Sequence, residues 1–218
     1  QAKKLKNYLM ENFTEEKMFN LFASSVLKNN IPLEEIDGIS FCIPTNGERP
    51  EKTNALLKSI SRQSGVPKEI ILCGDVQKFK DLKDVQLVDK RVDARSRKVA
   101  ALRNAAAEKT KYNVICFCDD DIVLEPDWME KTLEFSKENG WKVLGNQLLN
   151  PDGTRHWDRA ILMPHILVSY AHPEYDKKLI QTSGFMAIRK SVFDEVRWDE
   201  QKLVYSDRIE KDIPEDVK

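Results

Sequence analysis

Short apolar runs alternate with helix-like stretches from residue 39 onward, and this alternation constrains the fold more than any other feature. The runs that read as strands are residues 39–43, 69–73, 85–88 and 114–118. The stretches that read as helices are residues 50–60, with a proline in the first turn, and the alanine-rich residues 98–108. Strands that alternate with helices are typical of a mainly parallel sheet with right-handed crossovers. The sequence therefore predicts an α/β fold.

Polar residues follow three of these runs at the points where the strands would end. Thr45 follows the first run, Asp75 the second and Asp119 the fourth. In parallel sheets, ligands bind beyond the carboxyl ends of the strands, and these ends lie at one edge of the sheet. We therefore expect a binding site at this edge.

The most informative of these signals is a run of three consecutive carboxylates, Asp119, Asp120 and Asp121. Neighbouring carboxylates resist joint ionisation, and a bound divalent cation removes that conflict. Asp119 and Asp121 offer hard oxygen ligands, which Mg²⁺ and Mn²⁺ prefer when they also hold substrate phosphates. The alternative is a solvated acidic loop that precedes the next helix, which opens at residues 126–128. The convergence of polar signals at one edge favours a site.

The first 37 residues read as a helical extension that precedes this domain. Thr14, followed by two glutamates, is a suitable helix N-cap. Phe19, Phe22 and Val26 then form an apolar helical stripe. We expect the stripe to pack on the main domain; the alternative is that it contacts another subunit or an adjoining domain.

The second half of the chain is less regular. Residues 142–149 and 180–188 read as strands, and residues 191–196 read as a short helix. Gly184 lies inside the second of these strands, where a glycine often marks close approach by a ligand or another backbone segment.

Composition excludes some functions and suggests a compartment. The 218 residues suffice for one α/β domain, and the formal net charge of −1 argues against a nucleic-acid partner. No apolar run approaches the roughly 20 residues of a transmembrane segment, and no signal peptide opens the chain. The cysteines all fall in apolar runs, which predicts buried reduced thiols and a cytoplasmic protein: Cys42, Cys73, Cys116 and Cys118.

The motifs, taken in order, resemble those of the family 2 glycosyltransferases of the GT-A fold. These enzymes transfer a sugar from a nucleotide diphosphate, and their fold is Rossmann-like, with a mainly parallel central sheet flanked by helices. The resemblance covers about residues 38–218, which we take as the glycosyltransferase domain, after an extension of residues 1–37. The motifs that carry it are residues 41–50, 70–75, 100–106, 116–121 with 126–128, 182–185 and 215–216.

The resemblance implies a donor-binding role for the loops after the first two strands. The loop from Pro44 and Thr45 to Glu48, together with the side chain of Asp75, would hold the nucleobase, usually uracil. A carboxylate that accepts a hydrogen bond from the base N–H suits this task, although Asp75 could also serve only to form the turn. A UDP-sugar is therefore the favoured donor.

The resemblance also assigns the acidic cluster and the cations near it. Asp121 would bind Mn²⁺ or Mg²⁺ bridging the diphosphate, and Asp119 would contact the ribose or the water shell of the metal. Asp120 is grouped with the donor-binding residues. Lys98 and Arg103 would contact the base or diphosphate or pair with Asp119, and the guanidinium fork of Arg103 suits carboxylates and phosphates.

The remaining implied roles concern the acceptor. Asp216, in the pair with Glu215, matches the general base of an inverting displacement, in which a hydroxyl of a glycan or other acceptor attacks the anomeric carbon. Gly184 would leave room for the donor sugar or the acceptor. Family members usually continue with further helices beyond this base. Either the present chain lacks those helices or another segment supplies them.

Three other functions compete with this reading. A nucleotidyltransferase would need a glycine-rich loop after the first strand, and residues 44–50 do not form one. A phosphatase with an aspartyl nucleophile would carry its acidic pair after the first strand. A non-catalytic module that binds a nucleotide sugar, or a scaffold, is opposed by the presence of both Asp121 and Asp216.

Overall fold

The predicted alternation of strands and helices is present in the computed structural model, which describes residues 33–91, 99–154, 159–162, 167–169, 180–181, 184–198 and 200. The strands are β1 (Ile39–Thr45), β2 (Lys68–Gly74), β3 (Gln86–Asp89), β4 (Val114–Cys118), β5 (Val143–Gly145), β6 (Arg159–Leu162), β7 (Leu167–Ser169), β8 (Ile180–Gln181) and β9 (Phe185–Arg189). The helices are α3 (Pro50–Ser61), η1 (Gln77–Phe79), a 3₁₀ turn, α4 (Val99–Ala107), α5 (Trp128–Glu138) and α6 (Lys190–Glu195).

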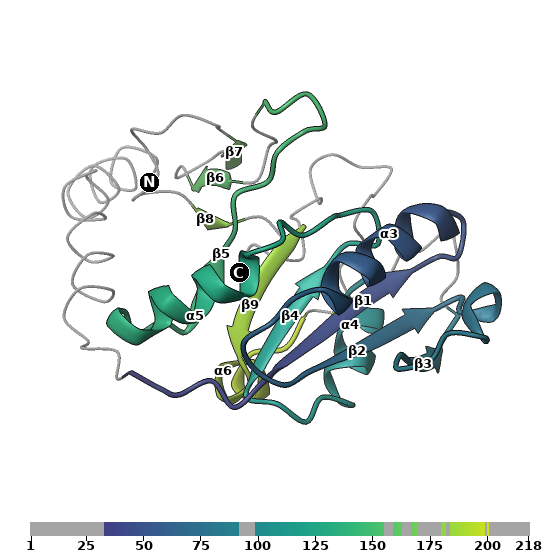
Figure 1. Ribbon diagram of the computed structural model, residues 1–218, viewed down its shortest axis with the longest axis horizontal. Coiled ribbons are helices and arrows are strands. Elements are labelled where there is room, and N and C mark those ends of the chain that lie inside the picture. Colours follow the sequence, from purple (N-terminus) through teal and green to yellow (C-terminus); the bar gives the residue numbers. More distant parts are fainter. Residues whose placement is uncertain are drawn as a thin grey trace, which may run out of the picture.

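A six-stranded sheet in the order β3-β2-β1-β4-β9-β5 forms the centre of the described structure (Figure 1). Strands β3, β2, β1 and β4 run parallel, whereas β9 is antiparallel to both β4 and β5. The prediction of a mainly parallel sheet is confirmed. In register, Thr45 lies opposite Gly74, and Cys42 lies opposite Phe117. The carboxyl ends of β1, β2 and β4 are therefore neighbours.

Successive side chains of the parallel strands point to opposite faces of this sheet, and helices cover both faces. On one face, Phe41 and Ile43 of β1 pack with Leu56 and Ile60 of α3 and with Met129 of α5. Because both faces are buried, β1, β4 and the last five residues of β2 are mostly apolar rather than alternately apolar and polar.

Helices α4 and α6 cover the opposite face. There Cys42 and Ile71 pack with Phe117, Leu102 of α4 and Phe193 of α6. Figure 1 shows this arrangement, with α3 and α5 in front of the sheet and α4 and α6 behind it.

The four cysteines are free thiols buried in this core, as predicted. Loss of hydration raises the pKa of Cys73 to about 11 and raises the pKa of Cys42 and Cys118 as well. Cys42, Cys73 and Cys118 therefore stay protonated at neutral pH and behave as small apolar side chains.

The second half of the chain departs from the predicted strands. Of residues 142–149, Val143–Gly145 form β5 in the central sheet. Beyond it, the Asn146 side chain accepts a hydrogen bond from Trp128 Nε1 at 2.7 Å and donates one to the carbonyl of Phe185 at 3.4 Å. The predicted strand 180–188 is divided between two sheets. Strand β8 joins β6 and β7 in a three-stranded antiparallel sheet, and β9 joins the central one.

Most of the predicted helical extension, including Thr14 and the apolar stripe, lies outside the described residues. None of the helices within the described ranges combines the length and apolarity needed to cross a bilayer.

Gly74 is expected to be the least tolerant of the described glycines, because a side chain there would collide with backbone. It has φ +137°, and a Cβ would lie 1.8 Å from the carbonyl oxygen of Thr45. We expect Gly74→Ala to lower the free energy of unfolding by at least about 2 kcal/mol in urea denaturation. Gly153→Ala is the matched control, since its φ is +81° and no atom lies within 4 Å of the added Cβ. We expect it to cost only about 1 kcal/mol. Equal losses in the two variants would contradict the steric argument.

Candidate active site

The loops that follow β1 and β2 meet at the carboxyl edge of the sheet. The amide of Asp75 donates a hydrogen bond to the carbonyl of Thr45 at 3.1 Å. Gly47 has φ +71°, and a Cβ there would lie 2.7 Å from the carbonyl oxygen of Asp75. Lys78 Nζ donates a hydrogen bond to the carbonyl of Gly47 at 2.8 Å. The structure therefore brings Thr45 and Asp75 together, as the sequence predicted.

Asp120 connects the end of β4 to the loop after β1. Its side chain is only 3% exposed. Asp120 Oδ2 accepts a hydrogen bond from Thr45 Oγ1 at 2.7 Å, and Oδ1 accepts one from Arg49 Nη2 at 2.6 Å. The amide of Gly47 in turn donates to Thr45 Oγ1 at 3.1 Å. Both carboxylate oxygens are thus occupied by neighbouring protein groups, and Asp120 orders the loop after β1.

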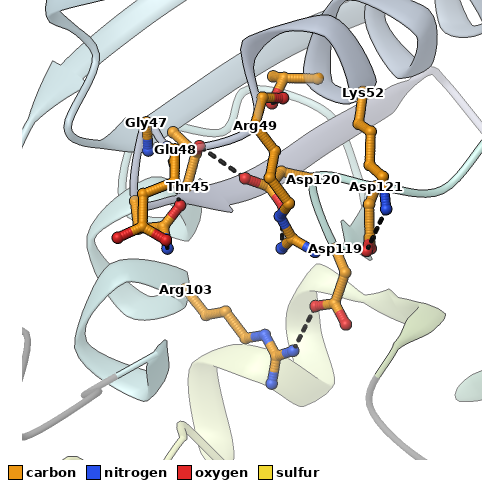
Figure 2. A network of polar contacts seen from close by, with 11 residues as sticks. Thr45, Gly47, Glu48, Arg49, Lys52, Arg103, Asp119, Asp120 and Asp121 are labelled. Atoms are coloured by element: carbon orange, nitrogen blue, oxygen red, sulfur yellow. Dashed lines mark hydrogen bonds and ion pairs between the residues drawn. The ribbon is translucent and has the colours of Figure 1, made fainter.

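Asp121 faces solvent and contacts two cationic side chains at the start of α3. Arg49 Nη1 donates to Asp121 Oδ2 at 2.5 Å, and Lys52 Nζ lies 3.8 Å from the same oxygen. The Asp121 side chain is 31% exposed. Figure 2 shows Arg49 and Lys52 reaching the acidic cluster from one side, and Arg103 reaching it from the other.

Asp119 pairs with Arg103, a buried residue of α4. Arg103 Nη2 donates to Asp119 Oδ1 at 3.1 Å. The Asp119 side chain is 43% exposed. Loss of hydration is nevertheless the largest influence on its pKa, and it raises that pKa above the ordinary value for aspartate. Arg103 opposes the rise, and the carboxylates of Asp121 and Asp120 add to it.

The segment after α6 holds Arg103 in place. The guanidinium of Arg103 lies 4.8 Å from the centre of the Trp198 ring, which makes a T-shaped contact with Phe117. The Asn104 side chain fixes this segment: its Nδ2 donates to the carbonyl of Trp198 at 2.9 Å and to Glu200 Oε1 at 2.8 Å, and its Oδ1 accepts from the amide of Trp198 at 3.1 Å. Asn104 and Trp198 therefore act on the site through Arg103.

Gly184 stands next to the acidic cluster, at the start of β9. Its carbonyl accepts a hydrogen bond from the amide of Asp119 at 3.0 Å. A Cβ at this position would lie 3.2 Å from Leu148 Cδ1 and 3.7 Å from Asp119 Oδ2. The sequence predicted Gly184 inside a strand, whereas the structure places it in a turn just before β9, where its absent side chain leaves Asp119 uncovered.

The other predicted site residues differ in their placement. Pro44 is buried within β1, opposite Cys73. Glu48 is exposed in the following turn, where its side chain accepts a hydrogen bond from Asn46 Nδ2 at 2.9 Å. Three further residues with predicted roles lie outside the described residues: Lys98, Glu215 and Asp216.

The carboxylates at this edge fit a hard divalent cation whose remaining ligands come from a bound substrate or from water. Among the residues that the structure describes, no three His, Cys, Asp or Glu side chains converge as metal ligands. Asp121 and Asp119 are both partly exposed carboxylates. Mg²⁺ is commonly held by one or two carboxylates together with substrate phosphates and water, so this pair suits such an ion.

Arg49 and Lys52 are the contacts to the acidic cluster that sequence reasoning missed. The sequence alone assigns no role to Arg49, which lies within the motif of residues 41–50, or to Lys52. A physical signal was available. Acidic side chains are favoured near the first turn of a helix, where the helix dipole is positive, and cations are not. Two cations at the start of a helix that begins at the carboxyl edge of the sheet therefore indicate nearby negative charge.

Comparison with known proteins gives a family match over most of the chain. The family model for glycosyl transferase family 2 matches residues 40–197. The curated protein y4gI of Sinorhizobium fredii, described as uncharacterized, is 26% identical over 119 residues, an alignment that covers 48% of this chain and 13% of that protein.

Crystal structures of S. aureus TarS 1-349 share the fold. The structure without a stated ligand has a TM-score of 0.56 at 16% identity, covering 82% of this chain and 52% of that one. The complex with UDP has a TM-score of 0.54 at 15% identity, covering 75% and 51%, and the complex with UDP-GlcNAc has a TM-score of 0.54 at 15% identity, covering 80% and 51%. The chain thus spans about half of the TarS structures. At these identities the likeness concerns the fold, and it confirms the predicted GT-A architecture.

The electrostatics of Asp119 can be checked by titration of the metal-free protein. We expect its pKa to lie above the ordinary value for aspartate, because loss of hydration outweighs the attraction of Arg103. Arg103→Gln removes a cation that lowers this pKa, so the variant should titrate at a still higher pH. Side-chain carboxyl ¹³C chemical shifts, followed by NMR from pH 2 to pH 8, measure both values, and Asp119→Asn identifies the resonance. A pKa that falls in Arg103→Gln would contradict this account.

The sign of the effect on stability follows from the same shift. A native carboxyl with a raised pKa binds more protons than the unfolded chain does over the interval between the unfolded and folded pKa values. The contribution of Asp119 to stability therefore falls as the pH rises through that interval. Asp119→Asn should weaken this pH dependence.

Proposed function

We propose, from the premise that this chain belongs to glycosyl transferase family 2, that it transfers a sugar from a nucleotide-diphosphate donor to an acceptor hydroxyl. The observation that carries the proposal is the convergence at one sheet edge of Thr45, Asp75 and the carboxylates of residues 119–121, with cationic side chains around them. Ligands of open parallel sheets bind at this edge.

The loops after β1 and β2 suit the nucleobase end of the donor. Asp75 lies beside Gly47, and its Oδ1 accepts a long hydrogen bond from the amide of Gln77 at 3.4 Å. A carboxylate has further lone pairs with which to accept from a base N–H. We favour a UDP-sugar, and this choice is supported by the similar fold of TarS, which has been crystallised with UDP and with UDP-GlcNAc.

The acidic cluster suits the diphosphate end of the donor. Asp121 and Asp119 would hold Mn²⁺ or Mg²⁺, which when bound supplies positive charge against the charge that develops on the departing diphosphate. Arg103 keeps Asp119 oriented through its 3.1 Å hydrogen bond. Asp120, occupied by Thr45 and Arg49, acts by fixing the loop that meets the base. Lys98 is proposed as an additional cation for the diphosphate.

The transfer itself is proposed to proceed with inversion. The acceptor hydroxyl attacks the anomeric carbon on the face opposite the diphosphate, a carbon–oxygen bond forms there, and the bond to the diphosphate breaks. Asp216, with Glu215 beside it, would take the proton of the hydroxyl. The absence of a side chain at Gly184 leaves space beside Asp119 for the donor sugar or the acceptor.

A ligand screen tests the donor and the metal together. We expect a UDP-sugar, in the presence of Mn²⁺, to raise the melting temperature of the protein by several degrees, since a ligand that binds only the folded state stabilises it by mass action. GDP- and dTDP-sugars serve as the comparison, and Asp121→Ala should lose the effect of the metal. A protein that no nucleotide sugar stabilises, with or without metal, would favour a scaffold function over an enzyme.

Replacement of the predicted base separates binding from chemistry. Asp216→Asn keeps the size of the side chain but cannot accept the acceptor's proton as a carboxylate does. We expect donor binding within about twofold of the unmodified protein and a loss of transfer rate of at least about a hundredfold. Glu215→Gln is the neighbouring control and should lose less. Normal turnover by Asp216→Asn would contradict the assignment of the base.

A further inference from the structure

Arg49 divides its two terminal nitrogens between two carboxylates with different surroundings. Its Nη2 contacts Oδ1 of Asp120 at 2.6 Å, and its Nη1 contacts Oδ2 of Asp121 at 2.5 Å. Asp120 is buried and is also held by Thr45, whereas Asp121 is partly exposed. One end of the guanidinium is therefore anchored in the protein, and the other covers the carboxylate proposed to bind the metal.

The backbone of Arg49 is fixed, but its side chain is not enclosed. Both the amide and the hydroxyl of Thr53 donate to the carbonyl of Arg49, each at 3.0 Å, which ties Arg49 to the first turn of α3. Its side chain is 44% exposed. A change of partner at Asp121 therefore requires rotation of the guanidinium and no movement of the strand or helix.

A divalent cation and Arg49 Nη1 compete for the same oxygen. A cation bound at Asp121 Oδ2 would stand within a few ångströms of the guanidinium, at a distance where ionic screening is weak. In the absence of a donor, this repulsion opposes metal binding. When a diphosphate is present, its negative oxygens offer the displaced Nη1 a new partner, because guanidinium groups bind phosphate oxygens well.

We propose that Arg49 is a positioning residue that makes metal binding depend on the donor. In the free protein it competes with the cation for Asp121, and when the donor is bound it keeps Asp120 and transfers its other contact to the diphosphate. This inference rests on the proposed function. It adds that the metal and the nucleotide diphosphate bind cooperatively, with Arg49 as the side chain that couples them.

The other cations of the cluster are less suited to this role. Arg103 is buried beneath the ring of Trp198 and contacts Asp119. Lys52 is 62% exposed and lies 3.8 Å from Asp121, a distance at which an exposed ion pair contributes little. Lys52→Gln is therefore the matched control, because it removes one positive charge near the same oxygen and leaves the short contact between Arg49 and Asp121 in place.

Binding of Mn²⁺ to the full chain, followed by the electron paramagnetic resonance signal of the free ion, tests the proposal. We expect Arg49→Gln to bind Mn²⁺ alone about five- to tenfold more tightly than the unmodified protein, and Lys52→Gln to change this affinity less than about twofold. Addition of UDP should tighten Mn²⁺ binding strongly in the unmodified protein and several-fold less in Arg49→Gln. Asp121→Asn should weaken Mn²⁺ binding in every case and so identifies the site.

Two outcomes would overturn the proposal: Mn²⁺ alone binding no more tightly to Arg49→Gln, or UDP tightening Mn²⁺ binding by the same factor in both proteins. Structural damage weakens binding, so it cannot produce the expected gain.

Arg49→Lys, which keeps one charge but not the fork, should bind Mn²⁺ alone as weakly as the unmodified protein while losing part of the coupling. A failure of the proposed function is distinguishable, because UDP would then bind none of these proteins, whereas the comparison with Mn²⁺ alone needs no donor.

Discussion

The hydrogen bonds of one buried carboxylate determine how this edge of the sheet is built. Asp120 follows β4, accepts from Thr45 at the end of β1 and accepts from Arg49 at the start of α3. A buried carboxylate is costly unless cations and donors surround it, so the loop after β1 is drawn toward the end of β4. Once Thr45 is held there, Asp75 and Gly47 are placed with it through short backbone contacts. The base and diphosphate ends of the proposed donor site therefore depend on a single residue.

Charge pairing then divides the three aspartates into different tasks. Consecutive carboxylates repel one another, and cations on both sides of the sheet offset this repulsion: Arg49 just before α3, Lys52 in α3, and Arg103 in α4. Arg103 is buried and held by Trp198, so its pairing with Asp119 is fixed. Arg49 is half-exposed, so its pairing with Asp121 can change. The rigid pair fixes Asp119, and under the proposal above the exchangeable pair would leave Asp121 available to a metal ion.

The sheet and the convergence of Thr45, Asp75 and the three aspartates at its edge followed from the sequence because both depend on local patterns. Apolar runs such as residues 114–118 form strands only when both faces are covered, and strand ends in a parallel sheet must share an edge. Three features did not follow. The task of Asp120 and the contacts of Arg49 depend on which oxygen faces which nitrogen after folding. The division of residues 180–188 between two sheets depends on pairing partners far away in the sequence. The pattern of apolar residues shows which faces of a strand are buried, but it does not show which other strand pairs with it.

The link between Asn104 and Trp198 explains how a distant segment can serve the same site. The chain after α6 is fixed against α4 at Trp198 and Glu200, beside the arginine that orients Asp119. The proposed base, Asp216, is only 16 positions farther along the chain than Glu200. Sixteen residues span at most roughly 58 Å, so anchoring at Glu200 limits how far from it the proposed base can lie. Loss of the Asn104 contacts would release that anchor and would also uncover Arg103, so one amide side chain supports both the orientation of Asp119 and the segment that leads to the proposed base.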